Sequence, residues 1–210
     1  MPLITDIKPQ KNNKRFNIYL DGQFAFGLPA ETLVKAGLKI DQEISEEKIE
    51  RLIKEDDFVR IYNRVLKFLS FRPRSEKELK DWSKKKNVGE ETQKLVYQRL
   101  KHLGYLNDEE FAKWWIEQRT TFRPSGARLI ALELRQKGVP REIIDKLLFS
   151  SPSALITERA QALKIAKKKR ERLKGLSHRE AREKLGAFLA RRGFSWETIE
   201  EVLVDEKLGK

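Results

Sequence analysis

The chain has 210 residues, and its 45 Lys and Arg against 32 Asp and Glu give a formal net charge of +13. This surplus favours a polyanionic partner, either nucleic acid or an acidic protein surface, although solvated helix faces also account for much of it. The absence of cysteine excludes disulfides, thiolate catalysis and cysteine-bound zinc. The chain has neither a secretory signal pattern nor an apolar run near the roughly 18 residues of a membrane span. We therefore expect a cytoplasmic protein.

Residues 1–56 are expected to form a β-rich module with short helices. Two segments alternate apolar and polar residues, Ile4–Ile7 and Phe16–Leu20, and a polar loop separates them. Asp21-Gly22 follows, which is the strongest short signal for a hairpin, and the alternation then continues. The pattern predicts two or three short antiparallel strands.

Two short helices are expected to follow these strands. Pro29 opens the first, which is predicted over 30–36 and ends at Gly37. The second is predicted over 45–54, and a new helix is expected to begin at residue 57.

From residue 57 onward the apolar spacing is helical and it repeats. Phe71-Arg72-Pro73 precedes Phe122-Arg123-Pro124 by 51 positions. A forward shift of 55 places Ile130, Leu134, Val139, Ile144, Leu147 and Leu148 on Leu185, Leu189, Phe194, Ile199, Val202 and Leu203. We expect three-helix repeats over 57–105, 106–150 and 151–210. The predicted fold is mainly α, with tandem three-helix units in an elongated array behind a small β-hairpin-containing module.

Helix ends and core positions follow from the same pattern. Ser75 with Glu78, and Ser177 with Glu180, have capping-box spacing, and Ser151 is a predicted N-cap. The third helix of each unit is expected to pack across the first two. The positions expected to be mostly buried are Leu79, Trp82, Trp115, Ile130, Leu134, Leu147, Leu185, Leu189 and Leu203.

Nothing in the sequence indicates catalysis, a cofactor or a metal. The two histidines, His102 and His178, have no carboxylate at ligand spacing beside them. Neither a phosphate-binding glycine loop nor a nucleophile motif occurs. The paired carboxylates Glu109-Glu110 stand in a predicted first helical turn, where the helix dipole accounts for them. We expect a protein that is not an enzyme.

The basic residues are the candidates for binding a partner. Arg72, Arg74, Arg123 and Arg128 surround the two Phe-Arg-Pro elements, and the densest basic run contains Lys167, Lys168, Lys169 and Arg170. An arginine fork suits phosphate and carboxylate, but arginines near helix ends also satisfy terminal carbonyls, and a lysine run can be a solvated face. A further contact is predicted from the first hairpin loop, through Lys11, Lys14 and Arg15.

Two neighbouring residues have structural interpretations. Arg119 lies on the apolar side of its predicted helix, so it is expected to be partly buried and paired. Trp114 stands about 100° around the helix from Trp115, at the margin of the core. A packing layer between repeats is favoured for Trp114, and a partner anchor is the alternative.

The sequence resembles the RecX family, whose members modulate the RecA recombinase. The residues that carry the resemblance are Arg72-Pro73-Arg74-Ser75, Glu78-Leu79, Gly104-Tyr105-Leu106-Asn107-Asp108, Phe111-Ala112, Trp115, Arg119, Gly126, Ile130, Glu133-Leu134 and Lys137-Gly138-Val139. They cover the first two repeats. The third matches more weakly, and the β-rich segment before residue 57 lies outside the common core of the family.

The resemblance implies a non-enzymatic regulator of recombination and DNA repair. Such proteins bind the RecA filament on single-stranded DNA and inhibit its ATPase, strand-exchange and co-protease activities. The family has no shared catalytic motif, so no site residue is carried over. We expect a monomer. The alternative is a helix-turn-helix-like protein that binds DNA directly and acts without a recombinase.

Overall fold

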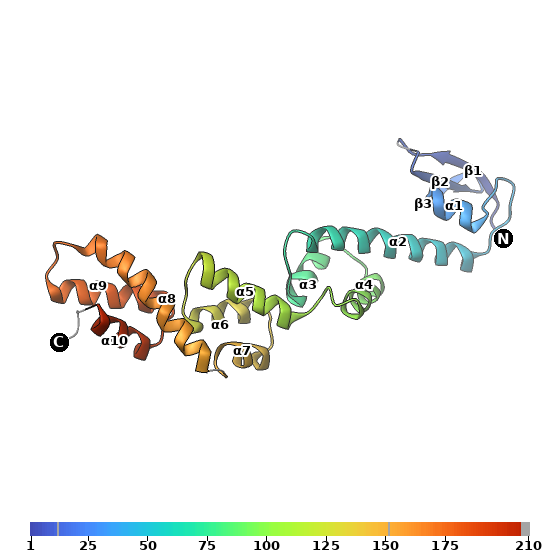
Figure 1. The fold of residues 1–210 in the computed structure, drawn as a ribbon. Helices are drawn as coiled ribbons and strands as arrows, with labels where there is room; N and C mark the ends of the chain where they lie inside the picture. Colours follow the sequence, from blue (N-terminus) through green and yellow to red (C-terminus); the bar gives the residue numbers. More distant parts are fainter. Residues whose placement is uncertain (12, 151, 207–210) are drawn as a thin grey trace. The chain divides into compact units, whose positions relative to one another are not determined.

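The computed structural model describes residues 1–11, 13–150 and 152–206, and for residues 152–157 it describes the backbone alone. The chain divides into two compact units. The first combines residues 1–71 with 86–102, and the second combines 72–85 with 103–210. Figure 1 labels the helices and strands of both units, and each unit is described by itself.

The first unit begins with an antiparallel sheet in the order β1-β2-β3. The strands span Ile4–Pro9, Arg15–Leu20 and Gln23–Pro29. Asp21 and Gly22 connect β2 to β3 with φ angles of 48° and 83°. Two central residues with positive φ give a type I′ turn, whose twist matches that of the flanking strands. The predicted β-rich module is therefore confirmed, with three strands.

The module has its own core, which α2 completes. The sheet contributes Ile4, Ile18, Phe26 and Leu28, and Leu52 of α2 packs against them. Helix α1 (Ala30–Ala36) ends where Gly37 turns left-handed, as predicted. Because a lone hairpin is marginal in water, the third strand and the helix surface supply the buried face that the alternation needs.

Helix α2 (Glu46–Leu69) is continuous, so the predicted break between residues 54 and 57 is wrong. Its buried residues are Leu52, Asp56, Ile61 and Val65. Asp56 interrupts the apolar pattern, which made one helix look like two, and no glycine or proline stands there to end it. The predicted domain boundary at residue 57 falls inside this helix. Helix α4 (Glu90–His102) packs against α2 in the same unit.

The second unit contains α3 (Glu76–Lys85) and the complete second repeat. That repeat consists of α5 (Asp108–Phe122), α6 (Ala127–Gln136) and α7 (Arg141–Leu148). Helix α7 contacts both α5 and α6, as predicted. One buried cluster holds them together, formed by Phe111, Ala112, Ile130, Ala131, Leu134, Val139, Ile144 and Leu148.

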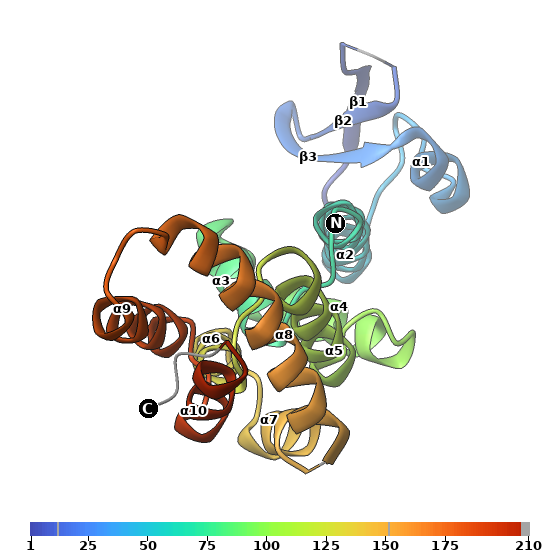
Figure 2. The same cartoon turned by 60° about the vertical axis from the view of Figure 1, so that its left-hand side comes forward.

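The third repeat has the same plan (Figure 2). It consists of α8 (Pro152–Arg170), the 3-10 turn η1 (Glu171–Leu173), α9 (His178–Arg191) and α10 (Trp196–Asp205). Its core contains Leu185, Leu189, Phe194, Ile199, Val202 and Leu203, the six positions that the 55-residue shift predicted. In the described residues the three repeats contain nine α-helices, α2 to α10, which is the predicted number, although α2 also takes in the separate helix predicted over 45–54. The Ser151 cap lies outside the described residues.

The predicted core is largely present. Six positions are buried: Leu79, Ile130, Leu134, Leu185, Leu189 and Leu203. Trp82, Trp115 and Leu147 are half-buried. The capping box of Ser177 and Glu180 is complete. The one predicted for Ser75 and Glu78 is half formed, because Ser75 caps the Glu78 N–H but the Glu78 carboxylate binds elsewhere.

Candidate partner-binding surface

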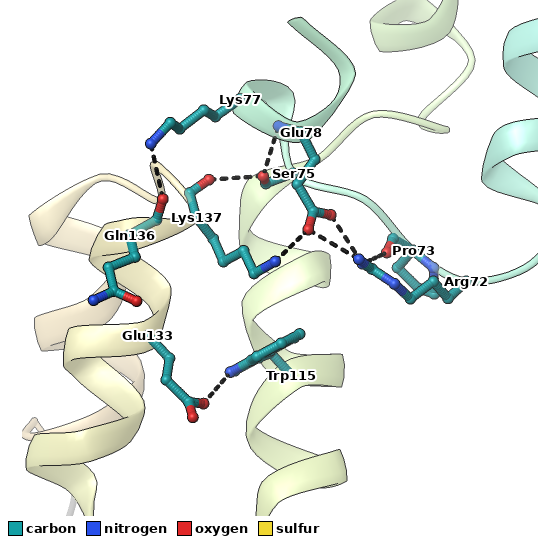
Figure 3. A network of polar contacts seen from close by, with 9 residues as sticks. All are labelled: Arg72, Pro73, Ser75, Lys77, Glu78, Trp115, Glu133, Gln136 and Lys137. Carbon is teal, nitrogen blue, oxygen red and sulfur yellow. Dashed lines mark hydrogen bonds and ion pairs between the residues drawn. The ribbon is translucent and has the colours of Figure 1, made fainter. Parts of the chain in front are cut away.

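The start of α3 meets the second repeat through three hydrogen bonds, which we call the first joint. Ser75 Oγ donates to the Lys137 carbonyl at 2.7 Å, and Lys77 Nζ donates to the Gln136 carbonyl at 2.9 Å (Figure 3). From the other side, Asp108 Oδ1 accepts the backbone N–H of Glu76 at 2.8 Å. A helix N-terminus carries unpaired N–H groups and partial positive charge, so a buried carboxylate suits it.

The second joint repeats this arrangement between repeats 2 and 3. Gly126 N–H donates to the Arg192 carbonyl at 2.8 Å, and Glu158 Oε1 accepts the Ala127 N–H at 3.2 Å. Gly126 lies 51 positions after Ser75, and Arg192 lies 55 after Lys137. The sequence repeat is therefore also a repeat of contacts between successive units.

Glycine is required at the second joint by close approach. A Cβ on Gly126 would lie 2.2 Å from the Gly193 carbonyl oxygen. A Cβ on Gly193, whose φ is +80°, would lie 2.4 Å from Leu129 Cβ. Both distances are far below van der Waals contact, so the two repeats pack with backbone against backbone.

Arg72 is held by a carboxylate beside the first joint. Its Nη1 and Nη2 donate to the two oxygens of Glu78, both at 2.9 Å, and Lys137 Nζ donates to the same carboxylate at 2.6 Å (Figure 3). Burial alone would raise the pKa of Glu78, but the hydrogen bonds and charges of Arg72 and Lys137 lower it to about 2. The Glu78 carboxylate is thus ionised between two cations.

Trp114 and Arg74 both lie close to Arg72 and are affected by its charge. The Arg72 guanidinium lies 5.6 Å from the centre of the Trp114 ring, which supports the interpretation of Trp114 as a packing residue between repeats. Burial and the neighbouring charge of Arg72 lower the pKa of Arg74. Arg72 therefore belongs to the packing around the first joint, rather than standing free on the surface.

Arg119 is partly buried and paired, as predicted. Its Nε donates to Glu133 Oε2 at 2.6 Å, and the Trp115 indole N–H donates to the same oxygen at 2.8 Å. The Arg119 guanidinium also lies 4.5 Å from the centre of the Trp115 ring. These contacts fix α5 to α6 inside the second repeat.

Arg123 and Arg128 differ from Arg72 although the sequence repeat aligns Arg123 with it. Both are exposed, and neither side chain has a hydrogen bond or ion pair with a described residue. Arg72 pairs with Glu78, but 51 positions after Glu78 the second repeat has Leu129. Arg123 therefore has no carboxylate at the corresponding place. Phe122, beside Arg123, is exposed as well.

The basic run at the end of α8 divides into two pairs. Lys167 and Lys168 are exposed and make no side-chain bond to a described residue. Lys169 lies 5.5 Å from the centre of the Phe188 ring, and Arg170 pairs with Glu206 at 3.2 Å. Lys169 and Arg170 therefore have contacts within the third repeat, whereas Lys167 and Lys168 make no such contact with a described residue.

The three basic residues predicted from the first hairpin loop also differ from one another. Lys11 and Lys14 are exposed. Arg15 donates to both oxygens of Asp56, at 2.8 and 2.7 Å, and to the Gly27 carbonyl at 2.9 Å. The Asp56 hydrogen bond raises the pKa of Arg15, and the fork joins the sheet to α2.

Sequence reasoning missed the two buried acids of the joints. Asp108 and Glu158 are each 8% exposed, although each stands on a polar position of its helix. Their separation of 50 residues is the feature of the sequence that could have identified them, because it nearly equals the spacing between successive repeats.

Among the described residues, no group of three or more His, Asp or Glu could hold a metal ion. No helix in the described part is long and apolar enough to cross a membrane.

The fold and this surface define a class of protein: tandem three-helix repeats, joined at buried helix starts, with exposed cations on successive repeats. Four family models match the chain: the regulatory protein RecX N-terminal domain at residues 2–45 and the first, second and third RecX three-helix domains at 62–100, 107–148 and 157–203. The chain belongs to the RecX family, as the resemblance in its sequence indicated. The match at residues 2–45 corrects the expectation that the β-rich segment lies outside the pattern of the family.

Individual relatives support the same assignment. The regulatory protein RecX of Bacillus subtilis is 36% identical over 200 residues, which cover 95% of this chain and 75% of that protein. The regulatory protein RecX of Clostridium perfringens is 33% identical, over 97% of this chain and 95% of its own length. A crystal structure of regulatory protein RecX superposes with a TM-score of 0.70 at 27% identity, over 96% of this chain and 98% of that one.

Proposed function

We propose that this chain is a non-enzymatic regulator of homologous recombination and DNA repair, which binds the RecA filament on single-stranded DNA in the cytoplasm. In this proposal it binds as a monomer and inhibits the ATPase, strand-exchange and co-protease activities of the filament. The observation that carries the proposal is the match to all four RecX domains in order along one chain.

The proposed contact surface consists of the exposed cations on repeats 2 and 3, namely Arg123, Arg128, Lys167 and Lys168. A filament repeats along its axis, so a binding protein made of repeats can present similar groups to successive protomers. The Arg123 fork suits a carboxylate or phosphate, and the exposed Phe122 adds apolar area beside it. Arg72 and Arg15 are not assigned to this surface, because their contacts support the fold. Arg74 is not assigned to it either, because its side chain is partly buried beside Arg72.

Cosedimentation tests this proposal. RecA filaments assembled on long single-stranded DNA are pelleted with the chain, and the same DNA without RecA is pelleted in parallel. We expect saturable binding that requires RecA. The Arg123→Glu/Lys167→Glu variant should bind several-fold more weakly, since each reversal removes an attraction and adds a repulsion. Arg135→Glu/Lys184→Glu, which reverses two exposed cations of α6 and α9, is the matched control.

Direct DNA binding is the second candidate, and the same four exposed cations favour it. Binding to the naked DNA would then equal binding to the filament. It would also weaken steeply with salt, because each neutralised phosphate releases counterions. That outcome would replace the filament proposal with the DNA-binding one.

A further inference from the structure

A pocket of about 320 Å³ opens between repeats 2 and 3, which we call the Trp196 pocket. Its apolar wall is formed by Leu129, Leu132, Ala190, Gly193, Phe194, Trp196 and Ile199. Trp196 is 65% exposed and Leu132 is 46% exposed, so two large apolar side chains border solvent. Exposed tryptophans beside a pocket are typical of binding hot spots.

The charges at this pocket have one sign. Arg128 of α6 and Arg191 of α9 line it, and no acidic residue does. Both arginines are exposed, and neither makes a hydrogen bond or ion pair with a described residue. An apolar pocket with two available guanidinium groups is complementary to a carboxylate next to a bulky apolar group.

The lining favours a peptide over a nucleobase. The side-chain hydrogen-bond donors in the wall are the two arginines and the indole N–H of Trp196, and no side chain there can accept a hydrogen bond. The N–H groups of a base inserted there would find no side-chain acceptor, which costs free energy, whereas a leucine or phenylalanine side chain has no such groups. The arginines can bind a phosphate or a carboxylate, so the choice between a nucleotide and a peptide depends on the apolar wall, which favours a peptide.

We infer that the Trp196 pocket binds an acidic segment of a partner protein, with one bulky apolar residue inserted and flanking carboxylates on Arg128 and Arg191. This goes beyond filament regulation, since it concerns a docking site for a peptide, which shares only Arg128 with the proposed contact surface. The second joint prepares the site: Gly193 lies against Leu129, and both line the pocket. A wall fixed before binding reduces the entropy cost of ordering it.

Fluorescence anisotropy with a defined probe tests the inference. The probe is a short fluorescein-labelled peptide of aspartate and glutamate with one central phenylalanine, and its partner probe has alanine at that place. We expect saturable binding of the first probe by the full chain and binding several-fold weaker for the alanine probe. Arg128→Glu/Arg191→Glu and, separately, Trp196→Ala should each weaken binding by about tenfold or more.

The control variant is Arg135→Glu/Lys184→Glu, which makes the same charge change on the same two helices outside the pocket. It should bind the phenylalanine probe within about twofold of the unmodified chain, because distant exposed charges act weakly through screening. Circular dichroism melting of every variant shows that the fold is retained. If Trp196→Ala melts early, Leu132→Glu replaces it.

Several outcomes would overturn the inference. They are no saturable binding of the phenylalanine probe, equal binding of the alanine probe, or equal weakening by the control variant. A labelled oligothymidine that binds and loses affinity in the same pocket variants would assign the pocket to nucleic acid instead. None of these results bears on binding to RecA filaments, which the cosedimentation measures separately.

Discussion

Asp108 and Glu158, 50 residues apart, make the same contact in successive repeats. Asp108 accepts the first N–H of α3, and Glu158 accepts the first N–H of α6. Each carboxylate comes from the first helix of the following repeat, so each repeat caps the one before it. In the third repeat the corresponding helix, α9, is capped by its own box of Ser177 and Glu180.

Removing the Asp108 carboxylate should destabilise the second unit. Asp108→Ala leaves the Glu76 N–H without its acceptor at a buried helix start, and such caps contribute about 0.5–2 kcal/mol. Asp108→Asn keeps an acceptor oxygen and should lose less. Urea unfolding measures both. Glu110→Ala, two residues away on the exposed face, is the control, and an equal loss there would contradict the capping role.

The glycine contact predicts opposite effects for two Gly→Ala changes. Gly126→Ala forces a Cβ into the Gly193 carbonyl and should cost roughly 1–3 kcal/mol, as overpacking does. Gly186→Ala lies inside α9, where the nearest atom to the new Cβ is 3.7 Å away. It should stabilise by roughly 0.5–1 kcal/mol, because alanine favours a helix. Thermal unfolding with the same sign for both would contradict the close approach.

Glu78 predicts a loss of stability in acid. Its pKa falls from an ordinary 4.5 to about 2 in the folded chain, so the stabilisation is complete above pH 4.5 and is lost as the pH falls through 2. The side chain is 14% exposed, and the shift corresponds to about 3 kcal/mol. Glu78→Gln should be less stable at pH 7, and the difference from the unmodified chain should shrink towards pH 2. A constant difference over this range, measured by urea unfolding, would show that the carboxylate charge has no such role.

Arg72 and Arg123 should respond differently to truncation despite their matching places in the repeat. Arg72→Ala removes two hydrogen bonds to a carboxylate and should cost on the order of 1–3 kcal/mol of stability. Arg123→Ala should change stability by less than about 0.5 kcal/mol, since its side chain is exposed and unbonded. Parallel melting curves measure this, and equal losses would mean that the surroundings of the two arginines are alike.

The sequence predicted the repeat and its core well, because buried helix faces must recur at a fixed spacing. Leu134 and Leu189 are both fully buried for that reason. The sequence could not predict which arginines stay exposed and without an ion-pair partner in the described part of the chain. That depends on a single facing residue, Glu78 in one repeat and Leu129 in the next. The break predicted in α2 was wrong for a similar reason, since Asp56 is buried only because Arg15, 41 residues earlier, binds it.

The most direct test of the proposed function is the ATPase rate of RecA on single-stranded DNA, titrated with this chain. We predict inhibition that saturates at a low ratio of chain to RecA. Arg123→Glu/Lys167→Glu should require several-fold more protein, while Arg135→Glu/Lys184→Glu should inhibit like the unmodified chain, since only the first pair lies on the proposed surface. An ATPase rate that stays unchanged at every ratio would contradict the account.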